Sequence, residues 1–203
     1  MSSSRPFVVV SGLAASGKTS LAEPLAQALG VPLISKDAIK EALFEAVGYG
    51  GTAWSKTLSR AADAAMVRIA QDLDGAVLDI FWYAETVDEL LAPLPRPIVE
   101  VFCRCDPEVA YERFRSRVRH PGHADQERDP DTLRAPFFTR AKKLPLRTLG
   151  PVVEVNPERA VEVGSVATRV VEGRTTPSRD CFWHLSARPS RLTLAPPGSL
   201  VRP

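Results

Sequence analysis

Short runs of apolar residues alternate with longer, more polar segments from Phe7 to Gly173. The runs are rich in valine, isoleucine and leucine, and they are continuous rather than alternating with polar residues. This pattern is typical of strands that are covered by helices on both faces of a sheet. The runs predict five strands, at residues 7–10, 31–35, 76–82, 97–105 and 152–156.

Between these runs, apolar residues recur at helical spacing. Leu21, Leu25, Ala28 and Leu29 form one such stripe, and Gly30 marks its end. The same spacing predicts helices at residues 18–30, 37–48, 53–75, 106–119, 131–144 and 157–173. Strands that alternate with helices predict a three-layer α/β fold with a mainly parallel sheet.

The chain divides into a domain and a tail. Residues 173–203 are rich in proline, arginine and serine and have no strand or helix period. Such a composition predicts a disordered or loosely docked tail after a single domain at residues 1–172. Inside the domain, the polar segment RHPGHADQERDP is rich in turn-forming residues, so residues 113–130 are a candidate lid.

Composition indicates the class of protein and its cellular compartment. The chain has 203 residues, of which 44% are hydrophobic and 25% charged, as in ordinary globular proteins. Its net charge of +2 is too small to indicate nucleic-acid or membrane binding by itself. Three cysteines fit a reducing compartment, and the sequence shows neither a signal peptide nor an apolar run of membrane length. We therefore expect a cytoplasmic protein that does not bind membranes.

The strongest chemical signal is GLAASGKT, at Gly12–Thr19, which matches the P-loop pattern G-x-x-x-x-G-K-[ST] between a predicted strand and a predicted helix. The glycines let successive backbone N–H groups point at phosphate oxygens, and the following helix presents its positive end to the same anion. Lys18 would reach the β- and γ-phosphates, and the Thr19 hydroxyl would bind Mg²⁺. A chance glycine-lysine loop is the alternative. The predicted nucleotide-binding residues are Gly12, Ala14, Ala15, Ser16, Gly17, Lys18, Thr19 and Ser20.

The rest of the chain narrows the class of P-loop protein. A switch GTPase would need an N-K-x-D segment, which is absent, and a large motor or AAA+-type ATPase would need a longer chain. Asp37 follows the second predicted strand, at the edge of the sheet where ligands bind, and could accept the proton of an attacking hydroxyl. A helix N-cap is the other role for this residue. Lys40, one turn on, could hold an acceptor anion or neutralise the transferred group.

Asp79 and the aromatic residues after it lie at the end of the third predicted strand. A carboxylate there could orient the water shell of Mg²⁺, although a purely structural hydrogen-bonding role is also common. Phe81, Trp82 and Tyr83 follow at the same edge and could line an acceptor pocket, although such clusters are more often core.

Arginines are concentrated in YERFRSRVRH, before the candidate lid. Arg113 and Arg117 are four residues apart on a predicted helix and could clamp phosphates and stabilise the transferred group. Arg115 and Arg119 are weaker candidates. The alternative is a solvated basic helix face, the usual meaning of a charge run.

In this order, GLAASGKTS, ISKDAIKEAL, AVLDIF and CRCDPEVAYERFRSR with RHPGHAD resemble the small P-loop kinases of the AAA_33/zeta-toxin-like group. The 5′-kinase domain of phage polynucleotide kinase and chloramphenicol phosphotransferase are similar in layout. The resemblance covers about residues 7–173.

The resemblance implies a five-stranded parallel sheet in nucleotide-kinase-like order, ATP and Mg²⁺ as cofactors, and transfer of phosphate to a hydroxyl. It implies Asp37 as the general base and Arg117 as the lid arginine near the γ-phosphate, with Arg113 beside it. Lys40 stands where polynucleotide kinases have an arginine, which weakens the polynucleotide interpretation because lysine cannot make the same bidentate contact.

Three hypotheses follow. The first is an ATP-dependent kinase that acts on a small molecule, the second a 5′-hydroxyl polynucleotide kinase, and the third an ATP-binding regulatory or toxin-type module with little turnover. The acceptor itself is not readable from the sequence, nor is the preference between ATP and GTP. Candidate acceptor contacts are Lys40, Trp54 and Trp82.

Overall fold

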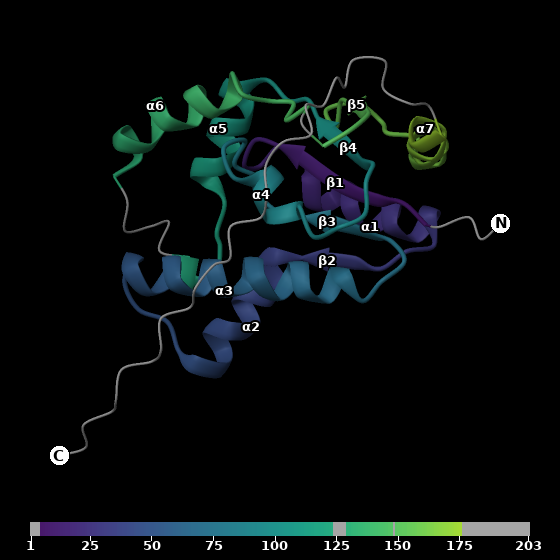
Figure 1. Cartoon of the computed structure of the whole chain (residues 1–203). Coiled ribbons are helices and arrows are strands. Elements are labelled where there is room, and N and C mark those ends of the chain that lie inside the picture. The colour runs from purple at the N-terminus through teal and green to yellow at the C-terminus, as the bar shows by residue number, and fades with distance from the viewer. Residues whose placement is uncertain (1–4, 124–128, 148, 176–203) are drawn as a thin grey trace, which may run out of the picture.

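A computed structural model of the chain describes residues 5–123, 129–147 and 149–175 (Figure 1). Within these residues, five strands form one sheet in the order β2-β3-β1-β4-β5, and all neighbouring strands are parallel. The prediction of an α/β fold with a five-stranded parallel sheet is therefore confirmed. The strands are β1 (Phe7–Gly12), β2 (Leu33–Ser35), β3 (Ala76–Asp79), β4 (Ile98–Cys103) and β5 (Val152–Val155).

Helices cover both faces of this sheet (Figure 1). Val8 and Val10 of β1 point to one face and pack in a cluster with side chains of the first and last helices, whereas Phe7 and Val9 pack on the other face. Burying each of these side chains contributes about 1.5–3 kcal/mol of transfer free energy. The helices are α1 (Lys18–Leu29), α2 (Lys36–Val47), α3 (Thr52–Gln71), α4 (Val87–Leu91), α5 (Pro107–Ser116), α6 (Pro130–Ala141) and α7 (Val163–Thr175), with a 3₁₀ turn η1 (Pro121–His123).

The strand register places the candidate residue Asp79 at one edge of the sheet, beside two other strands. Asp79 is the register partner of Val10 in β1 and of Ser35 in β2, so the carboxyl ends of these three strands lie level. The segments that leave those ends are the phosphate loop, the start of α2 and the aromatic segment after β3. Ligands of open parallel sheets bind at this edge.

Several element boundaries differ from the sequence prediction. The third strand ends at Asp79 rather than at residue 82, and α5 ends at Ser116 rather than at residue 119. After Ser116 the backbone becomes extended at Arg117, and the chain runs towards α2. The short helix α4 was not predicted at all. α7 begins at Val163, later than the predicted start at residue 157. Glu162 caps it there, because its carboxylate accepts hydrogen bonds from the backbone N–H groups of Gly164 and Ser165.

The predicted domain boundary and lid lie only partly within the described residues. α7 continues through Thr175, so it passes the expected boundary at residue 172, and the remainder of the predicted tail, residues 176–203, lies outside the described residues. Residues 124–128 of the predicted lid also lie outside them. No described helix combines the length and the apolar character that a membrane crossing requires.

A buried carboxylate supports the strand that leads into the phosphate loop. Glu100 of β4 is fully buried and accepts a hydrogen bond of 2.5 Å from the Ser11 hydroxyl in β1. The same carboxylate accepts bonds from the backbone N–H groups of Leu146 and Arg147, at 2.8 and 2.9 Å. Glu100 therefore ties the end of β1 to the segment that precedes β5, and three hydrogen bonds satisfy its two carboxyl oxygens.

Candidate active site

The loop between β1 and α1 has the conformation that its glycines allow. Gly12 and Gly17 have φ angles of 141° and 90°, and Ala15 adopts 61°. A Cβ atom on Gly12 would lie 2.6 Å from the Ser16 hydroxyl and 2.8 Å from the Cys103 carbonyl, so a larger residue would displace backbone. The loop is therefore closely packed as well as strained, and glycine is required at its first position.

The same loop fits a bound anion. α1 begins at Lys18 without a side-chain cap, which leaves the N–H groups of its first turn available to a ligand. Ser16 is fully buried, and its hydroxyl has no hydrogen-bond partner among the described residues. A phosphate group would supply acceptors for these donors, and the residues present therefore fit a nucleotide phosphate chain.

Lys18 is buried and folds back over the loop. Its Nζ donates hydrogen bonds to the carbonyls of Gly12 and Leu13, at 3.2 and 2.6 Å. Burial lowers the pKa of Lys18 to about 8, although the charges of Asp79 and Asp37 oppose this effect. The charge of Arg117 adds to the lowering. Both carboxylates and the arginine are therefore within electrostatic reach of the lysine that would contact the transferred phosphate.

Thr19 and Asp79 form the pair expected of a magnesium site. The Thr19 hydroxyl donates a hydrogen bond to the Asp79 carboxylate, which is 5% exposed. Burial raises the pKa of Asp79, and the bond from Thr19 and the charge of Lys18 partly oppose this. Among the described residues, no group of three or more His, Cys, Asp or Glu side chains could hold a metal ion. Mg²⁺ bound by Thr19 and Asp79 would therefore need phosphate and water oxygens to complete its coordination.

Asp37 lies in the first turn of α2 and is not its cap. Ser35 occupies the N-cap position, and its hydroxyl accepts a bond of 3.5 Å from the N–H of Ala38. The Asp37 carboxylate is 59% exposed and pairs with the guanidinium of Arg119. Ser35 thus takes the N-cap role that was the alternative for Asp37. The Asp37 carboxylate remains accessible at the edge of the sheet.

Arg119, a weaker candidate in the sequence, is the arginine that reaches Asp37. It comes from the extended segment after α5 and also lies 3.2 Å from Nε2 of His123. Nε2 of His123 lies 2.9 Å from the carboxylate of Glu41, and burial lowers the pKa of this histidine. A chain of polar contacts thus runs from α2 through Arg119 to η1.

Arg113 and Arg117 do not share a helix face, because α5 ends between them. The Arg117 guanidinium lies 4.9 Å from the centre of the Phe114 ring. Arg113 instead faces the connection between β5 and α7, 3.9 Å from the Glu158 carboxylate and 3.8 Å from Cys105 Sγ. Of the two predicted clamps, Arg117 is therefore the one whose charge acts on Lys18.

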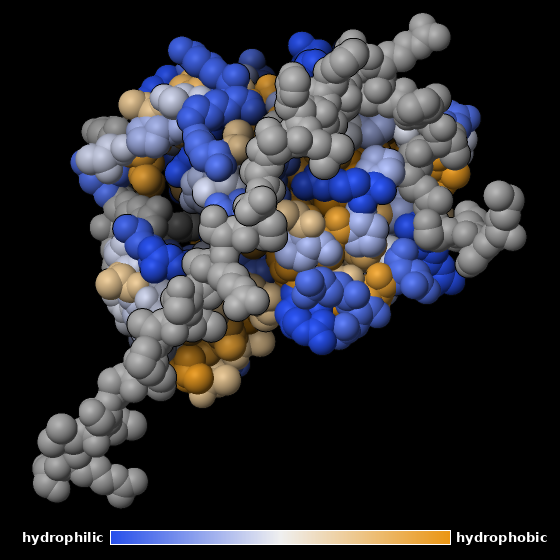
Figure 2. Space-filling view, viewed as in Figure 1, coloured by the Kyte–Doolittle hydropathy of each residue, from blue (hydrophilic) through white to orange (hydrophobic). Residues whose placement is uncertain are grey.

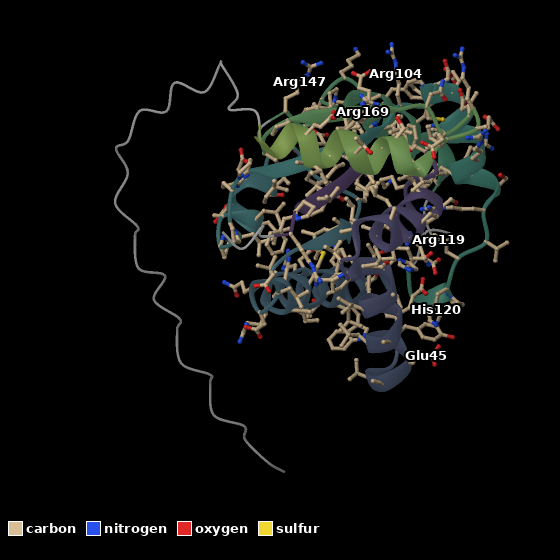
Figure 3. The ribbon with its side chains drawn as sticks, turned by 90° about the vertical axis from the view of Figure 1, so that its right-hand side faces the viewer. Glu45, Arg104, Arg119, His120, Arg147 and Arg169 are labelled. Atoms are coloured by element: carbon tan, nitrogen blue, oxygen red, sulfur yellow. The ribbon has the colours of Figure 1, made fainter. Side chains whose placement is uncertain are left out.

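Aromatic stacking holds the segment 119–123 against α2. The ring of His120 stacks on Phe44 at 5.2 Å, and the edge of Tyr49 contacts His120 at the same distance. A Cβ atom on Gly122 would lie 2.5 Å from the Phe44 ring, so the turn packs closely on this aromatic residue. Figure 3 shows Arg119 and His120 beside α2, near Glu45, whose carboxylate lies 3.9 Å from His120.

Each of the predicted acceptor residues forms a hydrogen bond within the fold. Lys40 is buried and donates a bond of 2.9 Å to Ser55, which ties α2 to α3. Trp54 donates to the Gly48 carbonyl at 3.1 Å, near the exposed apolar end of α2 (Figure 2). Trp82 is 5% exposed and donates to the Val10 carbonyl at 3.0 Å, so it belongs to the core.

The aromatic segment after β3 is therefore divided between core and site. Trp82 turns inward, whereas Phe81 and Tyr83 contact each other edge to face, with ring centres 5.4 Å apart. Lys18 Nζ lies 5.7 Å from the centre of the Phe81 ring. Alternation along an extended segment is a signal that could have separated Trp82 from its two neighbours.

Comparisons with known proteins bear on the family and the fold of the chain. The family AAA_33, described as an AAA domain, matches residues 7–135. No curated protein matches the chain in sequence. Among solved structures, a "putative kinase" from Chloroflexus aurantiacus J-10-fl is similar, with a TM-score of 0.67 and 24% identity over 83% of this chain and 98% of that one.

Two further structures share the fold. A gluconokinase from Sinorhizobium meliloti 1021 has a TM-score of 0.54 and 21% identity, covering 84% of this chain and 91% of its own. Shikimate kinase from Aquifex aeolicus VF5 has a TM-score of 0.52 and 17% identity, covering 82% and 94% respectively. At these identities the likeness concerns the fold.

Proposed function

The chain belongs to the AAA_33 family, and from this premise we propose that it is an ATP-dependent kinase that phosphorylates a hydroxyl group of a small molecule. One observation carries the proposal. Lys18, Asp79 and Asp37 meet at the carboxyl edge of the sheet, where the charges of both carboxylates act on the lysine. A phosphate loop alone binds a nucleotide, whereas a phosphate loop beside an accessible carboxylate can also transfer phosphate.

The donor side positions the nucleotide. The N–H groups of the loop from Ala15 to Thr19 bind phosphate oxygens, and Lys18 leaves its carbonyl partners to contact the β- and γ-phosphates. Thr19 and Asp79 would hold Mg²⁺, which would neutralise charge on the phosphate oxygens. The guanidinium of Arg117 stabilises charge on the transferred group, as its influence on Lys18 suggests.

The acceptor side supplies the base. Asp37 takes the proton of the acceptor hydroxyl while the hydroxyl oxygen bonds to the γ-phosphorus. The bond between the γ-phosphorus and the bridging oxygen breaks, and ADP leaves. The Arg119 guanidinium contacts Oδ2 of Asp37, so the other oxygen of the carboxylate can accept this proton.

Small acceptors are favoured over nucleic acid. Two proteins of known structure share the fold, a gluconokinase and a shikimate kinase. Their names indicate that they act on small hydroxylated molecules. Lys40, which would be a candidate contact for a 5′-phosphate, is buried and bonded to Ser55. The net charge of +2 is also low for a protein that binds nucleic acid.

The proposal is tested by following labelled γ-phosphate. The protein is incubated with ATP or GTP and with sugars, hydroxy acids, nucleosides, antibiotics and a 5′-hydroxyl oligonucleotide. We expect label in a small-molecule product, and much less of it with a Lys18→Met variant. Label only in the oligonucleotide would support a polynucleotide kinase, and ATP binding without label in any acceptor would support a regulatory module.

A further inference from the structure

One cavity of the described structure lies outside the residues that carry the proposed chemistry. It has a volume of about 570 Å³ and lies between the segment after β3 and helix α6. Cavities of this size hold small-molecule ligands. Its lining includes Tyr83, Glu85, Pro136, Thr139, Arg140 and Lys143.

Arg140 lines this cavity and lies against two aromatic rings. Its guanidinium carbon lies 5.2 Å from the centre of the Phe81 ring and 4.8 Å from that of Tyr83. The two rings are nearly perpendicular, at 88°, so they hold the guanidinium from two directions. Stacking on rings fixes a guanidinium while leaving its edge free to bind an oxyanion with two hydrogen bonds.

The cavity carries more positive than negative charge. Lys143 forms an ion pair with Glu85, and Arg140 also acts electrostatically on Glu85. In the part of the chain that the structure describes, Arg140 has no ion pair of its own, so two cations face one carboxylate. This leaves the charge of one anion to be supplied by a ligand.

Phe81 connects the cavity to the phosphate loop. Lys18 Nζ lies 5.7 Å from the ring centre, and the Arg140 guanidinium carbon lies 5.2 Å from it. The two cations cannot be farther apart than the sum of these distances. A molecule the size of a sugar acid can therefore present a hydroxyl near Lys18 and an anionic group to Arg140.

We propose that this cavity binds the phosphate acceptor, that the acceptor is a hydroxylated small molecule with a carboxylate or phosphate monoester group, and that Arg140 binds this anionic group. The inference rests on the proposed kinase function and adds the chemical class of its substrate. Phe81 and Tyr83 orient Arg140. Lys143 leaves its ion pair with Glu85 and also binds the anionic group of the acceptor.

The test compares acceptors that share a carbon skeleton and differ in whether they carry the anionic group. D-gluconate is paired with D-glucitol, and glycerol 3-phosphate with glycerol, so that the two arms separate a carboxylate from a phosphate. Binding is measured by calorimetry and transfer by labelled ATP. We expect the wild-type protein to prefer the anionic member of at least one pair by about 10- to 100-fold, the usual effect of a charged hydrogen-bonding pair.

Variants of two arginines on α6 test whether Arg140 causes this preference for the anionic acceptor. Arg140→Gln should reduce it to less than threefold by raising the KM for the acceptor, with ATP affinity unchanged. Arg140→Lys keeps the charge without the bidentate contact and should retain part of the preference. The matched control is Arg134→Gln, since Arg134 also lies over two aromatic rings but pairs with Glu108 at 2.7 Å. It should change acceptor preference little.

Other outcomes would overturn the inference. These are equal use of the neutral and anionic members, a preference that survives Arg140→Gln, or no binding of either anion at tens of millimolar. Transfer to neutral alcohols without any role for Arg140 would leave the proposed kinase function in place. Anion binding through Arg140 without phosphate transfer to any acceptor would instead contradict the kinase function.

Discussion

The phosphate loop and the acceptor side of the site are built in different ways. The loop is a run of adjacent residues, closely packed, in which Ser16 is fully buried and Gly12 has no room for a side chain. The proposed acceptor side draws Asp37, Arg119, Phe81 and Arg140 from four separate segments, and the Asp37 carboxylate is 59% exposed. Donor binding is therefore a local property of the sequence, whereas acceptor binding depends on how distant segments meet.

The largest effect should come from the loop. Lys18→Met removes the cation that we propose contacts the transferred phosphate, and we expect transfer to fall by about 10²- to 10³-fold. The loss should be the same for every acceptor, because the change lies on the donor side. Steady-state kinetics with two acceptors check this, with the exposed Lys56→Met on α3 as the control. A loss that differs between acceptors would contradict the division into two halves.

The burial of Lys18 should also make stability depend on pH. The pKa of this lysine is about 8 in the folded protein, against 10.5 for a lysine exposed to water, as in the unfolded chain. Between these values the unfolded chain binds more protons, so the free energy of unfolding should rise as pH increases, by about 2 kcal/mol from pH 8 to 9.5.

Urea unfolding at several pH values measures this rise, and Lys18→Met serves as the reference because it cannot titrate. The difference between the two proteins should grow in favour of the wild type over this window. A constant difference would show that Lys18 is not desolvated in the loop.

On the acceptor side, Arg119→Gln should have a smaller and more selective effect. It breaks the pair with Asp37 and the contact with His123, which help to hold residues 119–123 against α2. We expect acceptor kcat/KM to fall by about tenfold with unchanged ATP affinity, the size of one charged hydrogen bond.

Arg115→Gln is the matched control for Arg119, since Arg115 forms an ion pair at the surface, 3.8 Å from Glu112. It should leave both kinetic constants within twofold of the wild type. Loss of ATP affinity in Arg119→Gln would place this arginine on the donor side instead.

The same contrast explains what the sequence could predict. The strands, the sheet and the phosphate loop follow from local patterns, and Asp37 follows from its place after a strand. The contact of Arg119 with Asp37 does not, because it depends on α5 ending at Ser116, inside a run that favours helix. Arg140 was missed because only the packing of α6 against the segment after β3 gives it a site.

Trp82 shows the limit of residue type as a guide. Phe81, Trp82 and Tyr83 are all aromatic. From the sequence, each could either line an acceptor pocket or pack in the core. The structure separates them, because the Trp82 indole reaches the Val10 carbonyl inside the fold whereas Tyr83 remains 45% exposed. Alternation places Trp82 opposite its neighbours but cannot tell which side is the interior.

The most direct test of the central claim, that the phosphate loop and Asp37 form one transfer site, is phosphate transfer by Asp37→Asn. The amide keeps the size of the side chain, and Ser35 continues to cap α2, so the fold should persist. Labelled transfer and ATP affinity are measured on the same protein, beside Arg119→Gln, which breaks the same pair but keeps the carboxylate. We predict a loss of transfer of about 10²- to 10⁴-fold with ATP affinity nearly unchanged. Transfer within tenfold of the wild type would contradict the account.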